Sequence, residues 1–163
     1  MRVLGIDPGT AITGYAVVEE TAGRLSLVTL GVITTPAKTP LPSRLQTIHR
    51  ELSSLVEEVA PDAAAVEELF FSRNVTTAMS VGQARGVTLL ALADAGLPIA
   101  EYTPMQIKQA VTGYGSAKKH QVQEMVRMLL SLRTVPKPDD AADAAAVAIC
   151  YLHRVKLDSL LET

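Results

Sequence analysis

The sequence predicts an α/β fold in which a five-stranded mixed sheet is flanked by helices. Residues 2–35 contain three apolar, β-branched runs with short connections, a pattern typical of antiparallel strands. Two later apolar runs, at residues 63–69 and 97–103, alternate with amphipathic helical stretches. The 163-residue length suits one domain, which we place at residues 1–156, with residues 157–163 as a short C-terminal tail that frays.

The first half of the chain supplies three strands and a helix. RVLGI ends at Asp7-Pro8-Gly9, and GYAVVEE and RLSLVTLGVITT follow on either side of a turn at residues 21–23. After the Pro-rich stretch TPAKTPLP, apolar residues recur at three- and four-residue spacings from near Ser43, which predicts an amphipathic helix ending at Pro61.

The second half alternates strands and helices. AAAVEEL predicts the fourth strand, and a long helix over residues 74–95 stops at Gly96 and Pro98. LPIAEYT predicts the fifth strand, and Pro104 opens a short helix. The glycine-punctuated segment TGYGSAKK leads to a helix carrying Val122 and Val126, and an Ala-rich helix covers residues 140–156.

Composition excludes several classes of protein. No apolar run approaches the ~20 residues of a membrane-spanning helix, so we expect no membrane association. Cys150 is the only cysteine and lies in an apolar helical stretch, which predicts a buried thiol and a cytoplasmic location. The net charge of −2 argues against nucleic-acid binding, but residues 101–137 carry six basic and two acidic side chains, a local charge of +4. Charge alone leaves a solvated helical face and a basic binding surface both open.

Four acidic residues stand where strands end or a helix begins. Asp7 ends the first strand at a Pro-Gly turn, and Glu67 ends the fourth. If these strands are neighbours, both carboxylates project from the same edge of the sheet. Asp140 and Asp143 share one face at the start of the last helix. Each acid taken singly has an ordinary explanation as a turn residue or a partner of the helix dipole.

Asp143 is the acid that a purely structural role explains least well. AADAAAVAIC is almost entirely small or apolar, so we expect a buried helix and a buried, unpaired carboxylate. Such a group is costly, and metal ligation is one way to keep it charged. Carboxylates suit Mg²⁺ or Mn²⁺, and two such ions about 4 Å apart activate water and stabilise the leaving oxygen of a phosphodiester. The acids therefore favour a two-metal site.

Five segments together resemble, in order, the RuvC family of Holliday junction endonucleases: LGIDPGTAITGYAVV, AVEELFFSRN, SVGQARG, QIKQAVTGYGSAKKHQV and DDAADAAAVAI. The resemblance extends to about His153. It implies a ribonuclease-H-like fold, a homodimer that acts on four-way junction DNA, and two-metal hydrolysis leaving 5′-phosphate and 3′-hydroxyl ends. It further implies a branch-migration complex of the RuvA and RuvB type as partner.

The resemblance also assigns residues. It places the catalytic, metal-binding acids at Asp7, Glu67, Asp140 and Asp143, in preference to the adjacent acids Glu68 and Asp139. Asp139 remains an alternative to Asp140, because Asp139 and Asp143 also share a helical face. Lys108 and Lys119 match basic positions close to the cut phosphate. The DNA contacts implied by the resemblance or suggested by their loops are Phe70 as a wedge, Phe71, Arg73, Asn74, Arg85, Gly115, Ser116 and Lys118, together with Lys108 and Lys119.

Some alternatives stay open at this stage. Packing of one or both of Phe70 and Phe71 in the core is the alternative to a DNA contact, and for Phe71 the two interpretations are evenly balanced. Gly82 and Gly86, four residues apart in a predicted helix, indicate a close approach either to the chain's own sheet or to a second subunit. GIDPGT also resembles the phosphate-contacting hairpin of actin-like ATPases and sugar kinases, whose chains are usually far longer. An RNA-processing relative of the same fold and a non-catalytic DNA-binding dimer are the remaining alternatives.

Overall fold

The computed structural model describes residues 1–68 and 75–161 and contains the mixed five-stranded sheet that the sequence predicts. The strand order is β3-β2-β1-β4-β5. The strands are β1 Arg2–Asp7, β2 Ile12–Thr21, β3 Arg24–Thr34, β4 Ala63–Glu67 and β5 Ile99–Tyr102.

The first three strands form the predicted antiparallel meander. β1 pairs with β2, and β2 pairs with β3, in antiparallel registers. The turn between β2 and β3 uses left-handed backbone at Ala22 and Gly23, with φ values of 51° and 79°. β4 and β5 instead run parallel to β1, because each is reached through a helical crossover.

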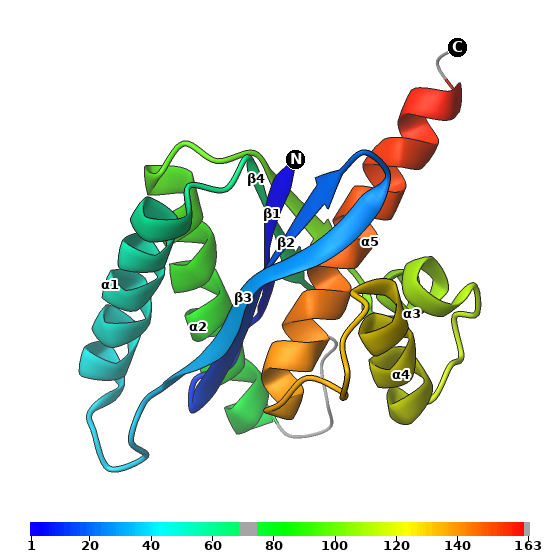
Figure 1. The fold of residues 1–163 in the computed structure, drawn as a ribbon. Coiled ribbons are helices and arrows are strands. Elements are labelled where there is room, and N and C mark those ends of the chain that lie inside the picture. Colours follow the sequence, from blue (N-terminus) through cyan, green and yellow to red (C-terminus); the bar gives the residue numbers. More distant parts are fainter. Residues whose placement is uncertain (69–74, 162–163) are drawn as a thin grey trace.

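Helices cover both faces of the sheet (Figure 1). α1 Leu41–Val59 and α2 Val75–Asp94 cover one face, and α5 Asp139–Leu161 covers the other. α3 Pro104–Thr112 and α4 Lys119–Leu129 pack mainly against α5 and against each other. Successive side chains of β1 point to opposite faces of the sheet, so this strand contributes to the core on both sides. Leu4 and Ile6 pack under α1 and α2, whereas Val3 packs under α5.

α5 lies directly on the backbone of the first two strands. A Cβ atom at Gly5 would lie 2.1 Å from the carbonyl oxygen of Ala144, and one at Gly14 would lie 2.0 Å from that of Asp140. The alanines of α5 keep this approach close, and the helix is buried from Ala144 to Cys150. Cys150 is fully buried, as predicted, and burial raises the pKa of its thiol to about 12.

The end of the last helix differs from the sequence prediction. α5 continues to Leu161, so residues 157–161 are helical where a fraying tail was expected. The stretch after Lys156 contains neither Gly nor Pro, and its leucines favour helix, so nothing local ends α5 at that point. None of the helices in residues 1–68 and 75–161 has the length and apolar character needed to span a bilayer.

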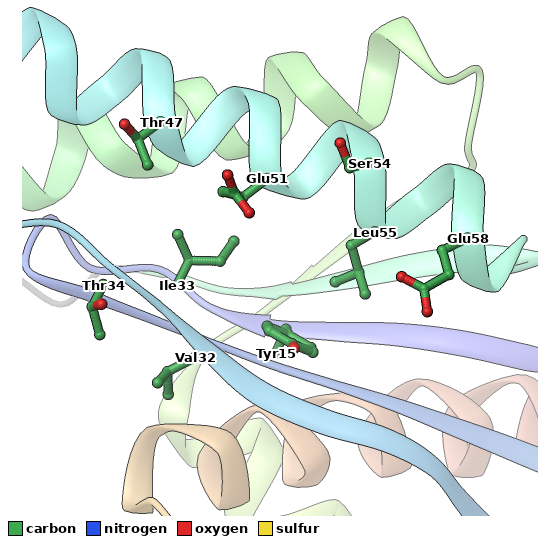
Figure 2. Close-up of a pocket in the computed structure, with 9 residues that line it drawn as sticks. All are labelled: Tyr15, Val32, Ile33, Thr34, Thr47, Glu51, Ser54, Leu55 and Glu58. Carbon is green, nitrogen blue, oxygen red and sulfur yellow. The ribbon is translucent and has the colours of Figure 1, made fainter.

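An open hollow of about 380 Å³ lies between α1 and the edge strand β3 (Figure 2). Tyr15 and Leu55 form part of its wall, and Glu51 and Glu58 supply its acidic groups. None of Asp7, Glu67, Asp140 and Asp143 lines this hollow.

Candidate active site

Asp7 and Glu67 end two neighbouring parallel strands. β1 and β4 are paired from Val3 with Ala63 to Ile6 with Val66, so the next residue of each strand reaches the same edge of the sheet. The adjacency on which the sequence argument depended is therefore confirmed. Because the carboxyl ends of parallel strands point the same way, the two acids are side by side although sixty residues separate them.

The two carboxyl groups share a hydrogen bond and perturb each other. Burial is the main cause that raises the pKa of Glu67 to about 8, and repulsion from Asp7 and Asp143 adds to it. Burial also raises the pKa of Asp7 to about 6, assisted by repulsion from Asp143 and Asp140. Near neutral pH the pair therefore holds one proton, which the two carboxyl groups share in their hydrogen bond.

The start of α5 brings further acids to the pair. Burial raises the pKa of Asp143, and the Asp143 carboxylate accepts a hydrogen bond from Lys119 Nζ at 2.9 Å. The expectation that this carboxylate would be unpaired was wrong, since α4 supplies a cation that the spacing on α5 alone does not reveal. Asp140 lies close enough to Asp7 to raise its pKa.

Asp139 faces different partners from Asp140. Lys137 Nζ donates to it at 2.7 Å, and Lys119 Nζ lies 3.6 Å away. The hydrogen bond from Lys137 is the main cause that lowers the pKa of Asp139. Asp139 is thus paired with lysines. Both Asp139 and Asp140 raise the pKa of Asp143, whereas Asp140 also raises that of Asp7. This contrast supports Asp140 as the fourth member of the cluster.

A hollow of about 250 Å³ opens beside these acids. Glu67 and Asp143 line one side, and two lysines line it from neighbouring helices, Lys108 on α3 and Lys119 on α4. Its apolar lining comes from Pro104, Ile107, Val122 and Ala146. Acids and lysines thus face a common space large enough for a phosphate group.

A hydrogen-bond network fixes the turn that follows Asp7. Thr10 donates to the carbonyl of Ser80 on α2 at 2.6 Å, and Thr35 donates to the carbonyl of Thr10 at 2.5 Å. Arg44 on α1 donates to the Thr35 hydroxyl at 2.7 Å. Sequence reasoning missed these residues, because the contacts join positions up to seventy apart and only the hydroxyl after Pro8-Gly9 offers a local signal.

The remaining predicted DNA contacts are spread over the chain. Phe70, Phe71, Arg73 and Asn74 lie outside the described residues. Arg85 forms an ion pair with Glu101 on β5 and is mostly buried, with 25% of its side chain exposed. Gly115, Ser116 and Lys118 lie between α3 and α4, where the Lys118 N–H bonds the Gln121 side chain at 2.8 Å. The Gly113 N–H donates to the carbonyl of Gln109 and so closes the end of α3.

The acid cluster supplies the hard oxygen donors that Mg²⁺ and Mn²⁺ prefer. In residues 1–68 and 75–161, no three His, Cys, Asp or Glu side chains are already arranged to hold a metal ion. The shared proton of Asp7 and Glu67 and the ammonium of Lys119 now offset the negative charge of the cluster. A divalent cation replacing them would relieve the same repulsion, so the donor set fits such an ion.

Comparison with known proteins identifies the family. A family model described as crossover junction endodeoxyribonuclease RuvC matches residues 3–151. The chain belongs to the RuvC family. The RuvC protein of Syntrophomonas wolfei is 57% identical over 163 residues, covering 100% of this chain and 95% of that protein. The RuvC protein of Chloroflexus aggregans is 60% identical over 153 residues, covering 94% and 93% of the two chains.

Solved RuvC structures have the same fold. The Thermus thermophilus RuvC structure superposes with a TM-score of 0.89 at 38% identity, covering 97% of each chain. T. thermophilus RuvC in complex with a Holliday junction substrate gives a TM-score of 0.89 at 35% identity, covering 96% of each chain. The ribonuclease-H-like fold class expected from the RuvC resemblance is confirmed.

The raised pKa values predict how stability depends on pH when divalent ions are removed. Glu67 has a higher pKa folded than its usual 4.5, so the folded chain holds more protons and stability falls as pH rises from about 4.5 to 8. In chelator, we expect Glu67→Gln to melt above the unsubstituted chain at pH 8, by a margin that shrinks toward pH 5. Differential scanning calorimetry at several pH values measures this margin.

The neighbouring substitution Glu68→Gln is the matched control, and its margin should not grow with pH in the same way. Each kcal/mol of stability corresponds to about 2–4 °C in a chain of this size. A constant difference between Glu67→Gln and the unsubstituted chain across this pH range would contradict the raised pKa.

Proposed function

We propose that this chain resolves Holliday junctions in DNA recombination and repair by cutting two strands symmetrically. The observation that carries the proposal is the meeting of Asp7, Glu67, Asp140 and Asp143 at one sheet edge, beside Lys108 and Lys119, in a member of the RuvC family. T. thermophilus RuvC, of the same fold, has been solved in complex with a Holliday junction substrate. The reaction is the hydrolysis of phosphodiester bonds, leaving 5′-phosphate and 3′-hydroxyl ends.

The four acids are proposed to hold two divalent ions, Mg²⁺ or Mn²⁺. When bound, such ions supply an activated water and stabilise negative charge on the leaving oxygen. Asp7 and Glu67 must lose their shared proton to become ligands, and their raised pKa values make that loss possible near neutral pH. Lys119, freed from Asp143, can then turn its ammonium toward the cut phosphate, and Lys108 faces the same hollow.

The proposed DNA contacts extend outward from the acids. Phe70 is proposed to wedge between bases at the branch, beside Phe71, and Arg73 and Asn74 are proposed to contact phosphates from the same segment. Lys118 and the backbone of Gly115 and Ser116 are proposed to contact the strand near the cut. Arg85 stays a proposed DNA contact. Its ion pair with Glu101 holds its guanidinium beside β5.

A homodimer is proposed to form through α2. The exposed residues of this helix recur at spacings of three and four and so form one stripe along it. They are Met79, Gly82, Gln83, Gly86 and Leu90. Met79 is 64% and Leu90 53% exposed, and a Cβ at Gly86 would have no atom within 4 Å among residues 1–68 and 75–161, apart from its own helix backbone and its chain neighbours. Packing within the chain therefore does not account for Gly86, whereas a second copy of α2 approaching closely would.

Two symmetric subunits would place two active sites on the two strands of a four-way junction. A RuvA and RuvB type complex is proposed, on family grounds, to deliver the junction.

The proposal predicts that the protein cuts a synthetic four-way junction in Mg²⁺ and spares the matched linear duplex. Asp7→Asn should keep junction binding and lower the cutting rate by more than about 100-fold, because changing a residue that merely supports a metal ligand already costs about 10–100-fold. Gel-resolved cleavage with and without Mg²⁺ measures both. Equal or faster cutting of an RNA–DNA hybrid would refute junction selectivity.

Substitutions of the neighbouring acids Asp139 and Asp140 of α5 should have different effects on the cutting rate in the same assay. Asp140→Asn should abolish cutting. Asp139→Asn should reduce the cutting rate by less than about tenfold, because Asp139 is paired with Lys137 in an exposed position. Each variant is the matched control for the other. The reverse ranking would move the fourth ligand to Asp139.

The α2 stripe predicts a monomeric variant. Gly86→Arg should convert the dimer to a monomer with an unchanged fold, because the added side chain enters open space in a single chain and collides only with a partner. Light scattering after size-exclusion chromatography, with circular dichroism for the fold, measures both properties. A dimer that persists in Gly86→Arg would place the interface elsewhere.

A further inference from the structure

Thr10 links the turn that follows Asp7 to α2, the helix proposed to carry the subunit interface. Its side chain is 7% exposed, and its hydroxyl donates to the carbonyl of Ser80 on α2 at 2.6 Å. Ala84 and Thr88 follow Ser80 at four-residue spacing and are fully buried, so this face of the helix points inward. α2 therefore contacts the active-site turn on one face and presents its exposed stripe on another.

The turn between β1 and β2 is tight. The Thr13 hydroxyl donates to the carbonyl of Gly9 at 2.7 Å, and a Cβ at Gly9 would lie 2.2 Å from the carbonyl oxygen of Ile12. In so compact a turn, a shift of Thr10 displaces its neighbours, including the backbone of Asp7 three residues earlier. A change in the position of α2 thus reaches the Asp7 carboxylate through the Thr10 hydroxyl.

Other bonds hold the turn independently of α2. The Thr35 hydroxyl donates to the carbonyl of Thr10 and accepts a hydrogen bond from Arg44 on α1 at 2.7 Å. The Thr35 N–H donates to the carbonyl of Ala11 at 3.0 Å. These bonds use the backbone of the turn, whereas the bond to α2 uses the Thr10 side chain. Removing one hydroxyl therefore breaks the link to α2 and leaves the others in place.

The rest of α2 is attached to other elements. Arg85 pairs with Glu101 on β5, and Asp94 at the end of the helix bonds the His49 ring on α1 at 3.2 Å. Within the chain the helix packs mainly against α1. A second subunit seated on the α2 stripe would therefore restrain the Ser80 end of the helix from outside, and through it the active-site turn.

Restraint of this turn bears on metal binding. A divalent ion needs Asp7 in one position, and binding costs less entropy when the turn is already restrained. We propose that the Thr10 hydroxyl couples α2 to Asp7, so that docking of a second subunit and binding of a divalent ion at the acids favour each other. Thr10 is thus a positioning residue. This inference rests on the proposed metal site and the proposed α2 dimer, and it adds a physical connection between them.

The coupling is tested by Mn²⁺ binding without DNA, measured by electron paramagnetic resonance of the free ion. Thr10→Val replaces the hydroxyl with a methyl group of similar size, and Gly86→Arg removes the partner subunit. Each should weaken Mn²⁺ binding by about 2- to 10-fold, the range expected for one net hydrogen bond. The double variant should match the weaker-binding single variant, because both changes remove the same link, whereas independent effects would multiply.

Two further variants separate positioning from stability. Thr10→Ser keeps the hydroxyl and should bind Mn²⁺ as the unsubstituted protein does. Thr88→Val is the matched control, since it removes another buried hydroxyl, which donates to the carbonyl of Ala84 at 3.0 Å within α2. It should lower the melting temperature about as much as Thr10→Val and leave Mn²⁺ affinity unchanged. If Thr10→Val does not fold, Thr10→Ala removes the same hydroxyl without adding a methyl group.

Several results overturn the inference: unchanged Mn²⁺ affinity in Thr10→Val, equal weakening by Thr88→Val, or effects of Thr10→Val and Gly86→Arg that multiply. A dimer that persists in Gly86→Arg also overturns it, because α2 would then not carry the interface. If the unsubstituted protein binds no Mn²⁺, the proposed metal site and this inference fail together. If it binds Mn²⁺ but does not cut a four-way junction, the proposed function fails while the Mn²⁺ measurements still decide the role of Thr10.

Discussion

The close seating of α5 on the backbone of β1 and β2 is the constraint on which the rest of the site depends. Gly5 and Gly14 leave no room for a Cβ atom under Ala144 and Asp140. Adding even one methyl group to such a contact typically costs about 1–3 kcal/mol. Because the helix can lie this low only over glycine, its first turns reach the edge of the sheet where β1 and β4 end. Asp140 and Asp143 are thereby brought to Asp7 and Glu67.

Crowding the acids has an electrostatic cost that the fold offsets locally. Asp7 and Glu67 share a proton, and Asp143 is paired with Lys119 from a separate helix. The Thr10 and Thr35 hydrogen bonds hold the turn after Asp7 against α2 and β3, so the carboxylates cannot relax apart by moving that turn. Burial, with repulsion added to it, therefore keeps the pKa values of Asp7 and Glu67 raised in the folded chain. Under this condition a cation binds with release of protons.

The sequence predicts the sheet, its parallel and antiparallel parts, and the edge at which Asp7 and Glu67 meet. These follow from local signals, since a Pro-Gly turn and a helical crossover determine which way each strand runs. The pairing of Asp143 with Lys119 and of Arg85 with Glu101 is not predictable in this way, because each joins elements whose packing depends on the whole core. The extension of α5 to Leu161 was missed for another reason: the absence of a stop signal is weaker evidence than its presence.

A chain with a net charge of −2 must still draw a polyanion onto a cluster of acids. Its negative charge is largely placed elsewhere, since Glu51 and Glu58 line the hollow by α1 while the stretch between Glu101 and Glu124 has none. Lys108 and Lys119 belong to that stretch and line the same hollow as Glu67 and Asp143, so a phosphate that enters the hollow meets ammonium groups beside the carboxylates. The phosphate backbone is thus attracted by α3 and α4, and only the bond to be cut needs to reach the carboxylates, where divalent cations would reverse the local charge. The distribution of charge, and not its sum, is what makes the proposed function compatible with an acidic protein.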